Sequence, residues 1–405
     1  MSTPGPFGSG EGDPLKGLLG DLAKLLGGQG DGFRWDAARQ FALQLATGGE
    51  SPANPDPLER IKLEQLVRVA ELHVGQATGL STSITDRPLT VNAVTRATWV
   101  VQSGDAYRPL FEALASSLST GATTTPPEVE AGDPMAAMFG PLMEAFAPMM
   151  LAMTTGSLLG HLARRSFGQY DLPIPRPPSD ELVLVPENIA EFREAWSLPA
   201  DDLALWVCVY EVAHHAVLGV PHVRATLSSL LAEYAAGFRT GGTDLDDRLG
   251  TLTFDDPSQF GSLEALQEAF ADPEVLLGAI RSDAQRALLP RLEALVAVIA
   301  GYVDHVMDEI GERIIGGYPM LTEAVRRHRV EADASDRFVA QLLGLDLTAA
   351  VYERGRAFID GVVERAGPEG LERLWRDERE LPTPAEVDAP GLWLARIDLP
   401  DDTAT

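Results

Sequence analysis

One segment of the chain, ADDLALWVCVYEVAHHAVLG at residues 200–219, constrains the fold more than any other. Its apolar residues run almost without interruption, and Asp201 and Asp202 stand at its start, where the dipole of a helix favours negative charge. Gly219 and Pro221 are residues that typically end a helix. We therefore predict one long helix over this segment.

Cys208 lies within the apolar run of this segment and is the single cysteine of the chain. A disulfide within the chain is therefore excluded. A reactive thiolate needs an exposed, electropositive setting, which an apolar run does not offer. We expect Cys208 to be a buried and unreactive side chain.

Apolar residues spaced by three and four positions predict further helices along the chain. They fall at residues 36–46, 56–77, 187–198, 284–311, 336–342 and 347–366. Strand-like patterns are short: LVLV at 182–185 is typical of a strand, and the Thr- and Val-rich stretch 81–102 has some extended character. The predicted fold class is mainly α with a few short strands.

Composition divides the chain into three parts. Residues 1–30 are rich in glycine, which predicts a flexible tail. A helical region follows at 31–134, and its last residues, TGATTTPPEVEAGDP at 120–134, are typical of a linker or surface loop. The remaining residues, 135–405, carry the 200–219 helix and the C-terminal helices, and we expect them to form one compact unit with 31–134.

The chain is strongly acidic, with 60 acids against 32 bases and a net charge of -28. Such a charge repels nucleic-acid phosphates and anionic lipid headgroups, so neither nucleic-acid binding nor binding to a membrane surface is expected. The first residues lack the basic region and apolar core of a signal peptide. The expected location is cytoplasmic.

Residues 135–162 are long and apolar enough to be considered as a membrane span, with Glu144 as their single charge. They also contain two internal prolines, Pro141 and Pro148, and many Met and Phe residues. This composition favours a pair of helices packed in the protein core, and membrane insertion is not expected.

The sequence YEVAHH at 210–215 differs at one position from the zinc-binding helix motif HExxH. In that motif two histidines four residues apart face the same side of a helix and bind one zinc, and the glutamate accepts a proton from the metal-bound water. Glu211 and His214 keep the spacing of the base and the second histidine. Tyr210 occupies the first ligand position, and a phenol, with a pKa of about 10, is a reluctant zinc ligand. His215 lies about 100° further round the helix and could pair with Glu211.

Four stretches, in this order, resemble one actinobacterial family. They are TGSLLGHLARRSFGQYDLPIP (155–175), WVCVYEVAHHAVLGVPHVR (206–224), GYVDHVMDEIG (301–311) and LWRDERELPTPAEVDAPGLWLARID (374–398). Members of that family are described as zinc-dependent metalloproteases or hydrolases of zincin-like fold, and a sister branch is named for its association with coenzyme F420 biosynthesis. The resemblance covers the chain well from residue 155 onward and more weakly before it. It implies a zincin-like metallopeptidase fold and a zinc-dependent hydrolase.

By this resemblance, the zinc ligands would be the two histidines of the helix and a glutamate from a second element, EGxxD. Here that element is AGYVD, so Ala300 stands at the third ligand position and has no donor atom. Asp304 matches the aspartate that would orient a ligand histidine through a hydrogen bond. With Tyr210 and Ala300 at two of the three ligand positions, the resemblance implies a degenerate zinc site. The candidates for substitute ligands are His222, His161 and His305.

Two functions follow as hypotheses. In the first, the chain is a metallopeptidase-family hydrolase in which Glu211 is the base and zinc binds His214 together with donors that the sequence does not identify. In the second, the same fold is a non-catalytic scaffold whose cleft binds a peptide or a protein, with LVLV at 182–185 as the edge to which a peptide would add. Because water activation fails without the metal, the missing ligands favour weak or absent catalysis.

Overall fold

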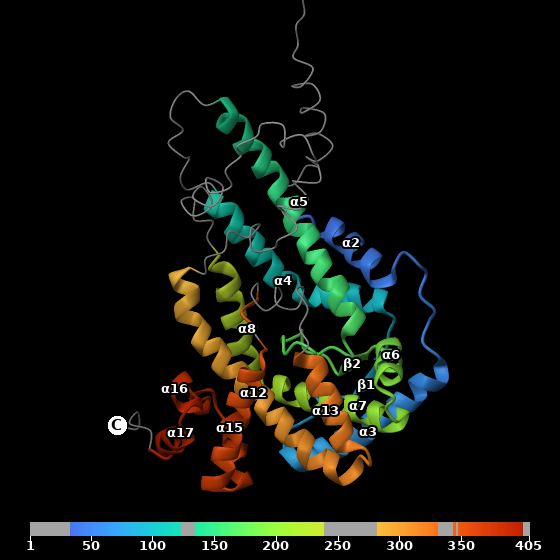
Figure 1. Ribbon diagram of the computed structural model, residues 1–405. Helices are drawn as coiled ribbons and strands as arrows, with labels where there is room; N and C mark the ends of the chain where they lie inside the picture. The colour runs from blue at the N-terminus through green and yellow to red at the C-terminus, as the bar shows by residue number, and fades with distance from the viewer. Residues whose placement is uncertain (1–32, 123–133, 239–281, 331–342, 346, 400–405) are drawn as a thin grey trace, which may run out of the picture.

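The computed structural model describes residues 33–122, 134–238, 282–330, 343–345 and 347–399, which form a mainly helical fold (Figure 1). Its α-helices are α2 (Trp35–Thr47), α3 (Pro57–Thr78), α4 (Arg96–Ala122), α5 (Pro134–Arg165), α6 (Pro186–Trp196), α7 (Ala200–Gly219), α8 (Pro221–Ala236), α12 (Asp283–Ile314), α13 (Tyr318–Val330), α15 (Ala349–Ala366), α16 (Pro384–Val387) and α17 (Pro390–Ile397). Two 3₁₀ segments, η2 (Pro368–Trp375) and η3 (Glu378–Glu380), precede the last two helices. The predicted class, mainly α with a few short strands, is confirmed.

Several predictions concern residues outside the described ranges. The tail at 1–30 and the helix at 336–342 lie outside them, and so does most of the loop at 120–134. The division between 31–134 and 135–405 stays a prediction, although α2 and α4 of the first part pack against α5 of the second.

Helix α7 confirms the helix predicted at 200–219. Every residue from Trp206 to Leu218 is buried, because α3, α6, α8, α12 and α13 pack around it. A helix that is apolar on all sides is stable only where all of its sides are covered. Cys208 is fully buried as predicted, and burial raises the pKa of its thiol.

Two short strands form a parallel two-stranded sheet. Strand β1 (Thr90–Ala93) lies in the stretch 81–102 that was expected to have extended character, but residues 96–102 of that stretch belong to helix α4. Strand β2 (Glu181–Leu184) overlaps the strand predicted at 182–185 and is shifted from it by one residue. In the register, Thr90 stands opposite Glu181 and Ala93 opposite Leu184.

The second edge of β2 is covered by the chain itself. The Val185 N–H donates to the carbonyl of Phe167 at 2.8 Å, and the Val183 N–H donates to Oε1 of Gln169 at 3.0 Å. A peptide could add to this edge only by displacing these bonds. The expectation that 182–185 offers an open edge is therefore wrong, because the preceding loop returns to pair with the strand.

Helix α5 is one continuous helix, and the expected pair of helices within 135–162 is wrong. A proline removes one backbone hydrogen bond, but good helix formers on both sides of Pro141 and Pro148 allow the helix to continue. Gly156 permits close packing on α2, because a Cβ there would lie 2.4 Å from the carbonyl oxygen of Ala38.

In the described part of the chain, no single helix is long and apolar enough to cross a membrane. The pair α7 and α8, which is bent by 88°, meets the criteria for a span only by its length and composition.

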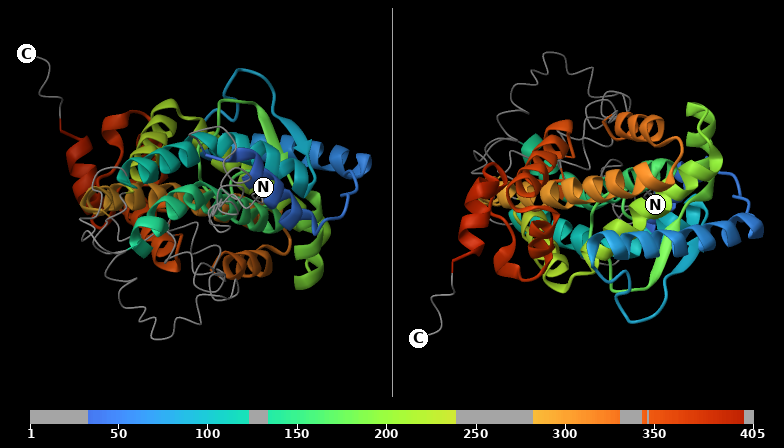
Figure 2. Two further views of the ribbon diagram at one scale, coloured as in Figure 1. Left: turned by 90° about the horizontal axis from the view of Figure 1, so that it is seen from above. Right: turned by 90° about the horizontal axis from the view of Figure 1, so that it is seen from below.

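Helix α12 runs across the molecule beside α3, as the view from below shows (Figure 2). It crosses α15 at two glycines: a Cβ on Gly355 would lie 1.9 Å from the carbonyl oxygen of Ala297, and a Cβ on Gly301 would lie 2.3 Å from the carbonyl carbon of Gly355. Only glycine allows the two backbones to approach this closely. The crossing brings the acidic side of α12 next to the first turns of α15.

Candidate functional site

Glu211, the residue at the base position, is fully buried and is held by the loop that precedes β2. Its Oε2 accepts the backbone N–H of Gln169 at 3.0 Å and that of Tyr170 at 3.1 Å. Gly168 allows this approach, because a Cβ there would lie 2.4 Å from the carboxyl carbon of Glu211. The carboxylate therefore anchors the loop to α7.

Asp171, from the same loop, lies close enough to Glu211 for the two acidic groups to repel each other when both are charged. Burial and the neighbouring Asp171 carboxylate raise the pKa of Glu211 well above its usual value. Burial also raises the pKa of Asp171 to about 6, although its Oδ2 accepts the N–H of Gly168 at 3.1 Å. Both acids therefore hold a proton more readily than exposed carboxyl groups do.

The two histidines of the motif are neutral side chains in the core, since burial lowers the pKa of each to about 4. Nδ1 of His214 donates to the carbonyl of Tyr210 at 3.1 Å, which leaves Nε2 as the acceptor of the ring. Nδ1 of His215 lies 3.0 Å from the hydroxyl of Tyr170. His215 thus bonds to Tyr170, whereas Glu211 bonds to backbone amides.

The ring of Tyr210 faces the guanidinium of Arg329, which comes from α13. The Cζ atom of Arg329 lies 4.4 Å from the centroid of Tyr210, 5.4 Å from that of Trp206 and 5.5 Å from that of Tyr352. Its Nη1 donates to Oδ1 of Asp304 at 3.0 Å, and the side chains of this ion pair are each 14% exposed. Cation–π contacts and an ion pair therefore hold the guanidinium between α7, α12 and α15.

These neighbours fix the charges at the site. Burial acts to lower the pKa of Arg329, whereas the carboxylate of Asp304 acts to raise it, and the net shift is upward. Burial raises the pKa of Tyr210 well above its usual value, so the phenol stays neutral. The first ligand position thus holds a neutral ring packed against a permanent cation.

Three residues of the zinc template, Tyr210, His214 and Asp304, lie near one another on α7 and α12. The ring centroids of Tyr210 and His214 are 4.3 Å apart, and Asp304 binds the guanidinium that covers Tyr210. Ala300 is buried one turn before Asp304, so the two residues share a face of α12. The roles of Glu211 and His214 as base and ligand stay predictions.

The substitute ligands proposed from the sequence lie on three helices: His222 on α8, His161 on α5 and His305 on α12. Within the described ranges, no group of three or more His, Cys, Asp or Glu side chains could hold a metal ion.

The residues present do not fit a zinc ion. Ala300 has no donor, the phenol of Tyr210 is neutral, and the carboxylate of Asp304 is bonded to Arg329. Glu211 is bonded to backbone amides. The imidazole of His214 is therefore the one side chain of this set that could serve as an ordinary zinc ligand. Because catalytic zinc takes three protein ligands, this set falls short.

Sequence reasoning missed the run of arginines on α13 that places Arg329 in this site. Arg326, Arg327 and Arg329 belong to the run RRHR at 326–329, which is conspicuous in a chain with a net charge of -28. That run was a signal for a site, but its partners could not be read from it, because Tyr210 and Asp304 lie far away in the sequence. His328, which also drew no prediction, stacks on Phe167, and burial lowers its pKa to about 4.

Comparisons with known proteins agree with this fold. No curated protein matches the chain. A solved structure from Chloroflexus aurantiacus, described as a "putative hydrolase with a novel fold", is 24% identical, with a TM-score of 0.62; the match covers 91% of this chain and 99% of that one, and it shows the fold alone. The profile of a family described as zincin-like metallopeptidase matches residues 34–394, almost the whole chain. The protein therefore belongs to the zincin-like metallopeptidase family.

Proposed function

We propose that this family member has exchanged its metal for the guanidinium of Arg329, so that zinc-dependent hydrolysis is weak or absent. The observation that carries the proposal is the position of Arg329, 4.4 Å from the ring of Tyr210 and 3.0 Å from Asp304. The positive charge that zinc would bring to this place is already supplied by the chain. The function that remains is the non-catalytic binding of a ligand beside Arg329.

Two physical effects oppose a metal here. A zinc ion about 5 Å from a buried guanidinium would be repelled by several kcal/mol at the effective dielectric constant of protein sites. The ligand set is also incomplete, since Tyr210 and Ala300 replace two donors. Without a Lewis acid, no water is activated and Glu211 has no acidified proton to accept.

A metal-dependent hydrolase is the competing function, and one observation favours it. Nδ1 of His214 donates to the carbonyl of Tyr210, which leaves the lone pair of the ring on Nε2, as in many metal-binding histidines. That function would require Glu211 to leave its two amides and Arg329 to leave Asp304. Donors from outside the described residues would also be needed.

Restoring the template tests the proposal. Tyr210→His combined with Ala300→Glu supplies the two missing ligands. We expect this double variant to bind zinc poorly while Arg329 is present and stoichiometrically once Arg329→Gln is added. Zinc content is measured by mass spectrometry after incubation with excess zinc and dialysis.

Two controls sharpen the experiment. Adding His214→Ala to the triple variant should abolish zinc binding if the ion sits at the template position. Equal zinc content with and without Arg329 would contradict the proposal, because the guanidinium would then not compete with a metal. Peptide hydrolysis by the parent chain that is lost with a chelator and in Glu211→Gln would also contradict it.

A further inference from the structure

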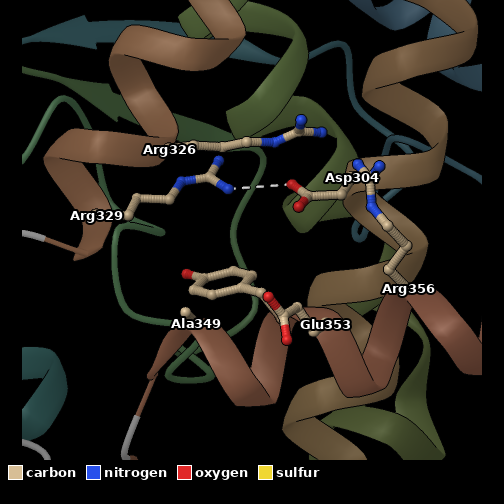
Figure 3. Close-up of a pocket in the computed structure, with 7 residues that line it drawn as sticks. Asp304, Arg326, Arg329, Ala349, Glu353 and Arg356 are labelled. Atoms are coloured by element: carbon tan, nitrogen blue, oxygen red, sulfur yellow. Dashed lines mark hydrogen bonds and ion pairs between the residues drawn. The ribbon is translucent and has the colours of Figure 1, made fainter.

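We propose that the pocket beside Arg329 binds the carboxylate group of a small monoanionic ligand. The pocket has a volume of about 280 Å³, and three arginines, Arg326, Arg329 and Arg356, line it. Figure 3 shows Arg326 and Arg329 reaching from α13 toward Asp304, with Arg356 beyond it. The inference rests on the proposed function in one respect, that Arg329 is the cation of this site in the absence of a metal.

The arginines bring more hydrogen-bond donors than their acidic neighbours accept. A guanidinium carries five N–H donors. Nη1 of Arg329 binds Asp304, whereas its Nη2 is buried without a hydrogen-bond partner in the described part of the chain. Nη2 of Arg356 donates to Oδ2 of Asp308 at 2.9 Å, and Arg326 approaches the same oxygen only to 3.6 Å. A planar carboxylate would give these donors the acceptor they lack.

The charge of the pocket favours a monoanion. The three arginines face Asp304 and Glu353 on the lining, which leaves one net positive charge there, and Asp308, which pairs with Arg356 and lies close to Arg326, balances that charge from just outside the lining. In a chain with a net charge of -28, a place where three arginines gather repels an anion less than the rest of the surface does. A phosphate dianion would bring two negative charges close to these three acids, so a carboxylate with a single charge is the better match.

The N-terminus of α15 adds a positive electrostatic potential at the pocket. Ala349 is the first residue of α15 and lines the pocket, and the N-cap residue Thr348 makes no side-chain capping bond. The backbone N–H groups of a first helical turn and the helix dipole both favour an anion. Tyr352 lies one turn further on and offers an aromatic surface to the apolar body of a ligand.

Benzoate is the probe that tests this assignment, with benzamide as its neutral analogue of the same shape and phenyl phosphate as the dianion. Affinities are measured by ligand-observed NMR titration of the full chain in the presence of EDTA. We expect benzoate to bind at least about tenfold more tightly than benzamide, because a charged acceptor strengthens each hydrogen bond. Benzoate should also bind more tightly than phenyl phosphate.

The arginines of α13 supply a matched pair of variants. Arg326→Gln should weaken benzoate binding by about tenfold or more, as expected for the loss of a charged donor. Arg327→Gln should leave it unchanged, because Arg327 pairs with Glu323 and does not line the pocket. Thermal unfolding of both variants confirms that they are folded, and Arg356→Gln repeats the test from the other wall.

Several outcomes would overturn the inference. They are the absence of benzoate binding to the parent, an equal affinity for benzamide, and a higher affinity for phenyl phosphate. A benzoate affinity that is unchanged in Arg326→Gln and Arg356→Gln would overturn it as well. The outcome is separable from the proposed function. Stoichiometric zinc in the parent would refute the loss of the metal, whereas the dependence of benzoate binding on the arginines is measured in the metal-free chain.

Discussion

Arg329 is a largely buried cation whose charge is balanced by one carboxylate and which lies against three aromatic rings. Tyr210, which replaces the first histidine of the motif, is one of those rings. The ring of a tyrosine can make a cation–π contact, which a metal-bound histidine cannot. Tyrosine at position 210 therefore stabilises the arginine at position 329 where the motif would place a zinc ligand. Asp304, expected to orient a histidine, instead binds the guanidinium.

Removing this cation should destabilise the fold. Arg329→Gln leaves Asp304 largely buried without its partner, so we expect a loss of about 3 to 5 kcal/mol in the free energy of unfolding, as for other broken buried ion pairs. Urea denaturation measures the loss. The matched control is Arg327→Gln, whose exposed ion pair with Glu323 should contribute less than about 1 kcal/mol. Equal losses in the two variants would show that Arg329 is not an internal counterion.

The pKa of Asp171 gives a prediction for pH. Burial raises that pKa from its ordinary value to about 6, so the folded state favours the protonated acid. The contribution of Asp171 to stability is complete below the unfolded pKa and is lost as the pH rises through about 6. Relative to Asp171→Asn, the parent should therefore lose stability between pH 4 and pH 7.

Thermal unfolding of both proteins across that pH range tests the sign. Comparing the two proteins cancels the contributions of acids that they share, such as Asp180, whose pKa is lowered by its hydrogen bonds despite burial. A difference in stability that is flat with pH, or that grows in favour of the parent, would contradict the assigned direction.

The crossing of α12 and α15 positions both the ion pair of Asp304 and the arginine pocket. Its two glycines, Gly301 and Gly355, determine how closely the helices approach. Gly301 falls within AGYVD, so part of that motif serves packing. The sequence alone suggested only its place in a ligand element.

Substitution at the crossing should be costly. Gly355→Ala would place a Cβ 1.9 Å from the carbonyl oxygen of Ala297, and we expect a loss of about 2 kcal/mol or more in the free energy of unfolding. Gly75→Ala is the control, because its Cβ would meet nothing within 4 Å in helix α3 and alanine is the better helix former. The free energies of unfolding of both variants are measured by chemical denaturation. If Gly355→Ala were as stable as Gly75→Ala, the close approach of α12 and α15 at Gly355 would be refuted.

Helices and strands were largely readable from the sequence, because apolar spacing is a local property. The predictions at 56–77 and 347–366 match α3 and α15 closely. Helix α5 differs from the predicted pair of helices, because Pro141 and Pro148 do not break it. The covered edge of β2 could not be foreseen, because its partner segment lies in an irregular loop without a strand pattern.

Across the whole molecule, the template residues were easier to find than their environment. The HExxH-like spacing singled out Tyr210, Glu211 and His214, and the family resemblance added Ala300 and Asp304 and implied that two ligands are missing. It did not show that Arg329 would bind between α7 and α12, because the contact depends on tertiary packing. The family membership fixes the fold, whereas the proposed loss of catalysis rests on these particular side chains.

Zinc content of the parent chain tests the central claim most directly. The protein is purified without an affinity tag, incubated with excess zinc, dialysed and analysed by mass spectrometry beside His214→Ala. The exchange of the metal for Arg329 predicts no stoichiometric zinc in either protein. Stoichiometric zinc in the parent that is lost in His214→Ala would contradict it, and the site would then be a rebuilt metal centre.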